Sequence, residues 1–264
     1  MKGWALAGVV IGAVPAAVAF APASWLAGAL ADATEQRLLL ADARGTVWQG
    51  SAVLVLTAGA GSRDASALPG RLQWRLGLDG AAILLHARHA CCINGEMTLR
   101  FVPGLARLRI ELPGAGAGAA AGPIGQWPAS WLVGLGTPWN TVMPSGTLQL
   151  SSPGLVLEQV QGRWRFSGSA QLDLGQFASR LSTLDALGSY RLIVSGDAAR
   201  GDATTLALST LEGALQLSGS GQVTASKLRF NGQADAAPGS EQALANLLNI
   251  IGRRRGASSI ISIG

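Results

Sequence analysis

Apolar and polar residues alternate along most of this chain after residue 32, and that period of two restricts it to a fold made mainly of β-strands. The alternation is clearest in five segments: SAVLVL (51–56), RLQWRLGL (71–78), MTLRFV (97–102), ARLRIEL (106–112) and KLRFNGQA (227–234). Successive side chains of a strand point to opposite faces, so each segment predicts a strand with one apolar and one polar face. Glycine and proline separate the segments, as in an antiparallel sheet.

A short glycine-bounded phrase occurs three times: GTVWQGSAVLVL (45–56), GRWRFSGSAQLDL (162–174) and GALQLSGSGQV (213–223). The first glycine of each copy permits the positive φ of a turn, and the next residues alternate as in a strand. The second glycine permits a bulge or a close backbone approach. Because glycines and bulges bend strands out of a flat array, the phrase predicts a curved antiparallel sheet.

A second repeat indicates an internal duplication. PASWL occurs at 22–26 and again at 128–132, and each copy is followed by a Gly-Thr pair that opens a strand, at 45–46 and 146–147. Between the copies lies GAGAGAAAGPIG (114–125), a low-complexity stretch typical of linkers. We therefore predict a first β half over 32–113, a linker over 114–127 and a similar second half over 128–264, with both halves extending one shared sheet.

Residues 3–31 contain no charged side chain. About 20 apolar residues are enough to cross a bilayer, and Lys2 precedes the run, so residues 1–31 predict a single transmembrane anchor with a cytoplasmic N-terminus. In a bacterium, the remainder of the chain would then be periplasmic. The alternative is a cleaved signal peptide, for which 17–19 and 19–21 supply small residues at the right spacing.

One amphipathic helix is predicted over 240–251. Its apolar side chains recur at the helical spacing i, i+3, i+4 and i+7: Leu244, Leu247, Leu248 and Ile251. Gly252 ends the helix, and three arginines (253–255) follow it. We expect the apolar stripe to pack on the sheet, the alternatives being a membrane-surface helix or a helix in a partner's groove. A last strand is predicted over 259–263.

The segment HARHACCI contains both histidines and both cysteines of the chain. On a continuous strand, His89 and Cys91 would face one way and His86 and Cys92 the other, so four ligands could not converge on a metal ion. The spacing also differs from the paired ligands of zinc sites. Cys91 and Cys92 could form a vicinal disulfide in an oxidising periplasm, but adjacent cysteines on an extended strand are poorly placed for one. We therefore predict thiols and no metal site.

Other chemistry-bearing motifs are missing from the sequence. It has no G-x-S-x-G nucleophile elbow, no phosphate-binding G-x-x-x-x-G-K and no evident pair of catalytic carboxylates. We predict that the chain is not an enzyme and has no catalytic residues, no cofactor and no small-molecule substrate. The net charge is +5, but the arginines are scattered apart from those at 253–255, so we expect no nucleic-acid partner.

Four segments together resemble the type II secretion system protein N family: GTVWQG (45–50), LGTPWNTVMPSGTLQLSSPGL (135–155), LSTLDALGSYRLIVSG (181–196) and GSGQVTASKLRFNGQADAAPGSEQALANLLNIIGRR (219–254). The resemblance implies a single-pass inner-membrane protein with a β-rich periplasmic domain. It further implies an accessory subunit of the machine that exports folded proteins through an outer-membrane secretin. The expected partners are the secretin and the inner-membrane platform, and the family has no catalytic residues to transfer.

The resemblance and the strand pattern together predict a scaffold, because a long curved sheet tethered to one membrane can extend toward another. The alternative is a periplasmic lipid-handling module whose apolar concave face shields acyl chains. A third possibility, an enzyme released by signal cleavage, lacks any converging acid, base and nucleophile.

Overall fold

The computed structural model describes residues 16–114, 123–160, 162–197, 203–224 and 227–264. The elements up to the middle of the chain are α2 (Ala23–Ala33), β1 (Leu38–Gly45), β2 (Gln49–Thr57), β3 (Ala65–Ala67), β4 (Leu72–Asp79), β5 (Ala82–His89), β6 (Met97–Gly104), β7 (Arg107–Pro113), β8 (Gly125–Pro128), the 3-10 helix η1 (Ala129–Leu135) and α3 (Trp139–Val142). The later elements are β9 (Ser145–Val160), β10 (Arg163–Ala178), β11 (Gly188–Gly196), β12 (Thr204–Glu212), β13 (Leu215–Thr224), β14 (Lys227–Ala236), α4 (Glu241–Ile251), β15 (Arg253–Arg255) and β16 (Ser258–Ile263).

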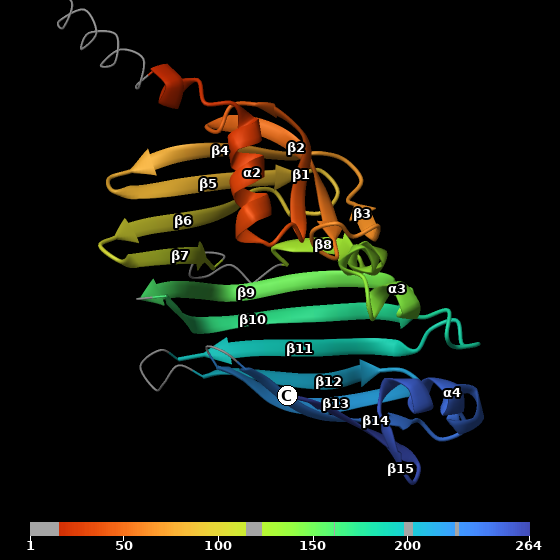
Figure 1. Cartoon of the computed structure of the whole chain (residues 1–264). Helices are drawn as coiled ribbons and strands as arrows, with labels where there is room; N and C mark the ends of the chain where they lie inside the picture. The colour runs from red at the N-terminus through yellow and green to blue at the C-terminus, as the bar shows by residue number, and fades with distance from the viewer. Residues whose placement is uncertain (1–15, 115–122, 161, 198–202, 225–226) are drawn as a thin grey trace, which may run out of the picture.

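Within these residues, sixteen strands form one antiparallel sheet (Figure 1). Its main path runs β1-β2-β4-β5-β6-β7-β9-β10-β11-β12-β13-β14-β16-β15, with β3 and β8 attached at the side. The predicted mainly β, antiparallel fold is confirmed. Strand β7 pairs directly with β9, so the strands on either side of the predicted linker share one sheet, as expected.

The sheet has one apolar and one polar face, because the alternating residues stay in register from strand to strand. One apolar ladder crosses β4, β5, β6, β7, β9 and β10 with Leu78, Ile83, Phe101, Ile110, Leu157 and Phe166. A second crosses β9, β10, β11 and β12 with Leu150, Leu172, Leu192 and Leu208. The opposite face carries polar neighbours such as Arg75, His86 and Thr98 on β4, β5 and β6.

Two separate hydrophobic clusters hold helices against the sheet. Near the N-terminus, Leu26, Ala27 and Leu30 of α2 pack around a buried group made of Ala23, Leu40, Ala52 and Trp74. Near the C-terminus, Leu244, Leu247 and Leu248 of α4 are buried with Leu187, Tyr190, Leu215 and Ala234. The predicted helix over 240–251, its apolar stripe and its packing on the sheet are confirmed, as is the last strand.

Helix α2 corrects part of the predicted anchor. The uncharged run was expected to form one membrane span over 1–31, but residues 23–33 fold back onto β1 and β2, and Ala23 is buried. The apolar spacing of Ala23, Leu26, Ala27 and Leu30 explains this packing, because it places four side chains on one face of the helix. Residues 1–15 lie outside the described part of the chain. Among the described helices, none is both long and apolar enough to cross a membrane.

The two copies of PASWL occupy equivalent positions. Each begins a helix with its proline as the N-cap, α2 in the first copy and η1 in the second. In addition, Pro22 pairs with Thr46 and Pro128 pairs with Thr147, the threonines of the two Gly-Thr pairs. This shared arrangement supports the proposal that the chain consists of two related halves.

The three copies of the glycine phrase behave as predicted. Their first glycines, at 45, 162 and 213, all have positive φ. Their second glycines, at 50, 168 and 219, leave no room for a side chain, since an added Cβ would lie within 2.5 Å of a neighbouring atom at each position. The phrase is therefore a strand entry that allows close packing of the next strand.

Candidate functional site

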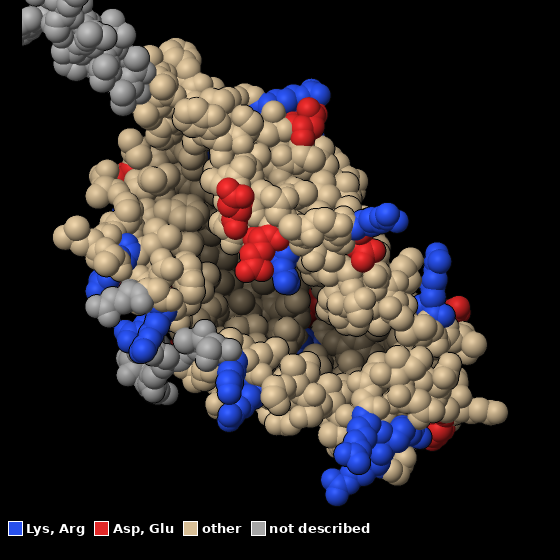
Figure 2. Space-filling view, viewed as in Figure 1, with Lys and Arg blue, Asp and Glu red and all other residues tan. Residues whose placement is uncertain are grey.

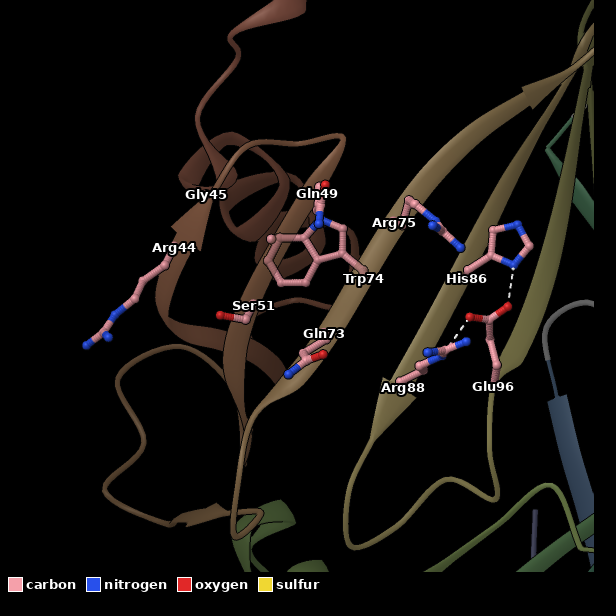
Figure 3. Close-up of a pocket in the computed structure, with 11 residues that line it drawn as sticks. Arg44, Gly45, Gln49, Ser51, Gln73, Trp74, Arg75, His86, Arg88 and Glu96 are labelled. Atoms are coloured by element: carbon pink, nitrogen blue, oxygen red, sulfur yellow. Dashed lines mark hydrogen bonds and ion pairs between the residues drawn. The ribbon is translucent and has the colours of Figure 1, made fainter.

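A polar cavity lies on the polar face, across β1, β2, β4 and β5 (Figure 3). Its volume is about 440 Å³. The lining residues are Arg44, Gly45, Gln49, Gly50, Ser51, Gln73, Trp74, Arg75, His86, Arg88 and Glu96. Strand register assembles this set, since Gln49 faces Arg75, Ser51 faces Gln73 and Arg75 faces His86.

The polar groups at one side of the cavity form a linked cluster. Glu96 lies 2.9 Å from Nδ1 of His86 and 2.7 Å from Nε of Arg88, as the dashed lines of Figure 3 show. Desolvation of the Glu96 carboxylate raises its pKa, but the charge of Arg88 and the hydrogen bond from His86 outweigh this effect. The pKa of Glu96 is therefore held below its usual value, and the carboxylate is ionised at neutral pH.

The geometry of His86 does not match a catalytic relay. The hydroxyl of Thr98 lies 3.2 Å from Nδ1 of His86, the same ring nitrogen that contacts Glu96. A histidine base of the triad type uses one ring nitrogen for the nucleophile and the other for the orienting carboxylate. With both partners on Nδ1, the cluster acts as a cross-strand clamp between β5, β6 and the loop that joins them.

The HARHACC segment differs from the expectation in two respects. Strand β5 ends at His89, and the two cysteines lie in the turn that follows, where Cys91 and Cys92 form a disulfide. The prediction of thiols was therefore wrong, because it assumed that the strand continues through residue 92. The bend also brings Cys92 to the side of His89 and Cys91, contrary to the prediction: the ligand atoms of these three residues lie within 4.8 Å of one another, and His86 is not part of this group.

His89 packs against this disulfide in the interior. Its side chain is 2% exposed, and Nδ1 lies 3.3 Å from Sγ of Cys91. Burial lowers the pKa of His89, so the ring is neutral at physiological pH. While the disulfide is intact, neither sulfur is a thiolate, the form that binds metals. That the segment binds no metal and performs no chemistry remains a prediction.

A second ion pair on the polar face links two long strands. The carboxylate of Asp173 on β10 accepts hydrogen bonds from Nε and a terminal nitrogen of Arg191 on β11, at 2.8 and 2.9 Å. These bonds, opposed by desolvation and assisted by Gln171, hold the pKa of Asp173 below its usual value. Like the Glu96 cluster, this pair fastens neighbouring strands to each other.

The apolar face is the second candidate surface. Figure 2 shows a hollow on the front of the molecule whose floor carries almost no charged side chains. Helices α2 and α4 cover the apolar face at its two ends, while the ladder residues Phe101, Ile110, Leu157 and Phe166 between them stay partly exposed. Such a surface can accept apolar material, which the polar cavity cannot.

We predicted no site residues from the sequence, and the residues lining the polar cavity could not have been grouped from it. They come from four strands and one loop, and only the register of those strands brings them together. The one available signal was the proximity of Glu96 to the two histidines, because a turn at Asn94–Gly95 returns the chain to β5.

Comparison with known proteins connects this curved, two-faced sheet to a family. The family model described as type II secretion system (T2SS), protein N matches residues 36–261. The chain belongs to that family. No curated protein and no solved structure gives a significant match. Membership in the T2SS protein N family identifies the chain as a component of the type II secretion system and confirms the resemblance seen in the sequence.

Proposed function

We propose that this T2SS protein N is a non-enzymatic, inner-membrane-anchored periplasmic subunit that acts as a scaffold between the inner-membrane platform and the outer-membrane secretin. The observation that carries the proposal is the continuous sheet. Its main path contains fourteen strands, which at about 4.8 Å per strand gives roughly 60 Å along the curve. A hydrogen-bonded surface of that length can hold binding partners at fixed separations.

Membrane attachment is proposed for the uncharged residues that precede α2. Residues 3–20 contain no charge, and Lys2 stands before them. This stretch of 18 residues is within the range that can cross a bilayer, and its flanking charge favours a cytoplasmic N-terminus. A periplasm-specific reporter fused after Gly264 should be active, and the protein should resist extraction with carbonate. Release of a mature chain that begins near residue 20 would contradict the anchor.

A structural role is supported by how the charged groups are used. His86 and Arg88 of β5 both contact Glu96 in the loop before β6, and Asp173 of β10 pairs with Arg191 of β11. The hydroxyl of Thr98 shares Nδ1 of His86 with the carboxylate of Glu96, and the sulfur beside Nδ1 of His89 belongs to the disulfide. These groups stabilise the sheet instead of converging on an open reaction centre.

The test is co-purification from detergent-solubilised cell envelopes. A tag on the C-terminus should capture platform subunits and the secretin, and amounts should fall when the platform is deleted. A matched control carries Leu248→Asp, which places a charge in the C-terminal core and should remove the folded partner surface. Capture of neither subunit by a stable, membrane-bound wild-type protein would refute the scaffold.

The second candidate, lipid handling, is favoured by one specific observation. Along its middle, the apolar ladder from Ile83 to Phe166 is covered by neither α2 nor α4, the described helices that pack on this face. Acyl chains could lie there, out of water. Mass spectrometry of the purified protein would distinguish the candidates: stoichiometric phospholipid that is lost in a Phe101→Asp, Leu157→Asp variant supports the groove, and its absence from wild type opposes it.

A further inference from the structure

The turns of five strand pairs lie at one end of the strands and form an edge that we call the hairpin rim. They are the connections β4–β5, β6–β7, β9–β10, β11–β12 and β13–β14. Figure 1 shows the first three on the left of the molecule, above one another. Residues 198–202 of the β11–β12 connection, 161 of the β9–β10 turn and 225–226 of the β13–β14 turn lie outside the described residues, so the rim is defined here by the described residues that flank the other four turns or lie in them.

Large apolar side chains are exposed to solvent at these turns, one in a turn and four at the strand ends beside the turns. The exposed fractions are 70% for Leu78, 103% for Leu105, 44% for Trp164, 36% for Val223 and 40% for Leu228. Single exposed apolar residues are normal on a protein surface, but five at successive turns of one edge form a row. Their position is not explained by packing, because all five lie outside both hydrophobic clusters.

Exposed basic side chains lie between these apolar residues along the hairpin rim. Arg107, Arg163, Lys227 and Arg229 are all exposed on the same turns or the adjoining strand ends. Asp79 is the acidic residue of the four turns, and it lies 3.4 Å from a terminal nitrogen of Arg100. Glu158 lies behind the rim, 3.5 Å from Nε of Arg107. Figure 2 shows Lys and Arg side chains along this left edge, so the rim as a whole is positively charged.

The N-terminal segment reaches the sheet at the same edge. Val18 and Ala19 line a mainly apolar cavity of about 620 Å³ with Trp48 and residues 76–78 at the end of β4. The indole nitrogen of Trp48 donates a hydrogen bond of 2.8 Å to the carbonyl of Val18. The largely uncharged stretch before α2, which we propose as the membrane anchor, therefore joins the fold beside the rim.

We infer that the hairpin rim docks on the surface of a bilayer that contains anionic phospholipid. Exposed tryptophan and leucine insert at the headgroup level, while arginine and lysine bind lipid phosphates, and the rim supplies both kinds of side chain in alternation. A bilayer surface is flat, and it fits this edge because turns at the same ends of neighbouring strands lie along one border of the curved sheet. This inference rests on the proposed membrane attachment and adds to it.

Docking fixes the orientation of the protein. Strands β9 and β10 each contain 16 residues, so at about 3.3 Å per residue they rise roughly 50 Å from the rim. The opposite ends of the strands, with η1, α3 and α4, then face away from the membrane and are free to bind other secretion subunits.

The test uses the full chain in proteoliposomes that contain phosphatidylglycerol. A photo-crosslinking amino acid is placed at Leu105, Trp164 or Leu228 on the rim. Matched controls carry it at Leu211 or Ile250, which are 48% and 55% exposed at the opposite ends of the strands. We expect lipid adducts from the rim positions at about five times the control yield or more. Equal yields from both edges, or no rim adducts, would overturn the inference.

A charge variant tests the electrostatic part of the docking. Replacing Arg107, Arg163, Lys227 and Arg229 by Gln should lower adduct formation at residue 105 at least fivefold, since even one basic residue near an anionic surface contributes about fivefold to binding. Adducts to another protein in place of lipid, when platform subunits are present, would identify a protein interface and oppose membrane docking. If the protein floats with the vesicles but gives no lipid adducts at the rim positions, docking of the rim is refuted and the proposed anchor is not. A chain that does not float refutes the proposed anchor as well.

Discussion

Truncation of one buried leucine in α4 should loosen the C-terminal end of the sheet without affecting the N-terminal end. Leu248 is 1% exposed in the C-terminal cluster, whereas Ile250 on the same helix is 55% exposed. Leu248→Ala removes most of a buried side chain but keeps the backbone carbonyl that accepts the hydroxyl of Ser259. The matched control, Ile250→Ala, removes a comparable apolar volume from a position in water.

The size of the destabilisation follows from the burial of the Leu248 side chain. A Leu→Ala change in a closed core costs about 3 kcal/mol, while the exposed control should cost less than about 1 kcal/mol. Because 1.4 kcal/mol corresponds to a factor of ten, the opening equilibrium of this cluster should rise roughly a hundredfold. Hydrogen exchange of the purified protein should therefore accelerate by about that factor in β14 and β16. Strands β1 and β2 should keep their rates, because they belong to the separate N-terminal cluster.

Two results would refute this reasoning. Equal acceleration in Leu248→Ala and Ile250→Ala would show that the assigned face of α4 is not the one that stabilises the sheet. Acceleration of β1 and β2 together with β14 would show that the two clusters unfold as one unit, despite the uncovered stretch between them.

Three further predictions concern the ion pair, the glycine phrase and the disulfide. The pKa of Asp173 is lowered, chiefly by its hydrogen bonds with Arg191, so the stability from this pair is present above its ordinary value of 3.8 and is lost as the pH falls below it. Denaturant titrations should show Asp173→Asn less stable than wild type at neutral pH, with the difference vanishing in acid. Gly50→Ala would place a Cβ 2.4 Å from an indole carbon and should lower the melting temperature by several degrees, whereas Gly77→Ala meets nothing within 4 Å and should leave it nearly unchanged. Serines at both positions of the 91–92 disulfide should leave substrate secretion near the wild-type level with at most a modest stability loss; lost secretion by a normally abundant variant would assign the pair a function.

The secondary structure was predicted best where a periodic sequence pattern had one physical cause. Alternation identified the strands because one face of the sheet had to be apolar along its whole length. The predicted helix differs from α4 by one residue, since Leu244 to Ile251 define its face and Gly252 ends it. The first glycine of each repeated phrase was assigned to a turn, and all three adopt positive φ.

The errors arose where one local pattern was compatible with two tertiary outcomes. Residues 3–31 were interpreted as one span because length and lack of charge describe both a membrane helix and a buried one; the spacing of Leu26 and Leu30 against the sheet decides between them. At residues 91–92, the strand was extended past its end, although Asn94–Gly95 indicated a turn. The polar cavity depends on strand register, which local periodicity does not contain.

The order of the strands also determines how the chain can fold. Along the sheet, most strands pair with the strand that precedes them in the sequence, and the larger steps, β7 to β9 and β14 to β16, pass over residues 114–144 and 237–257. Local pairing of this kind keeps loop-closure costs small and allows rapid assembly. A chain that is delivered N-terminus first can add each strand to an edge that is already in place. The growing edge is closed only at the end, when β15 presents three exposed arginines that discourage any further strand from joining.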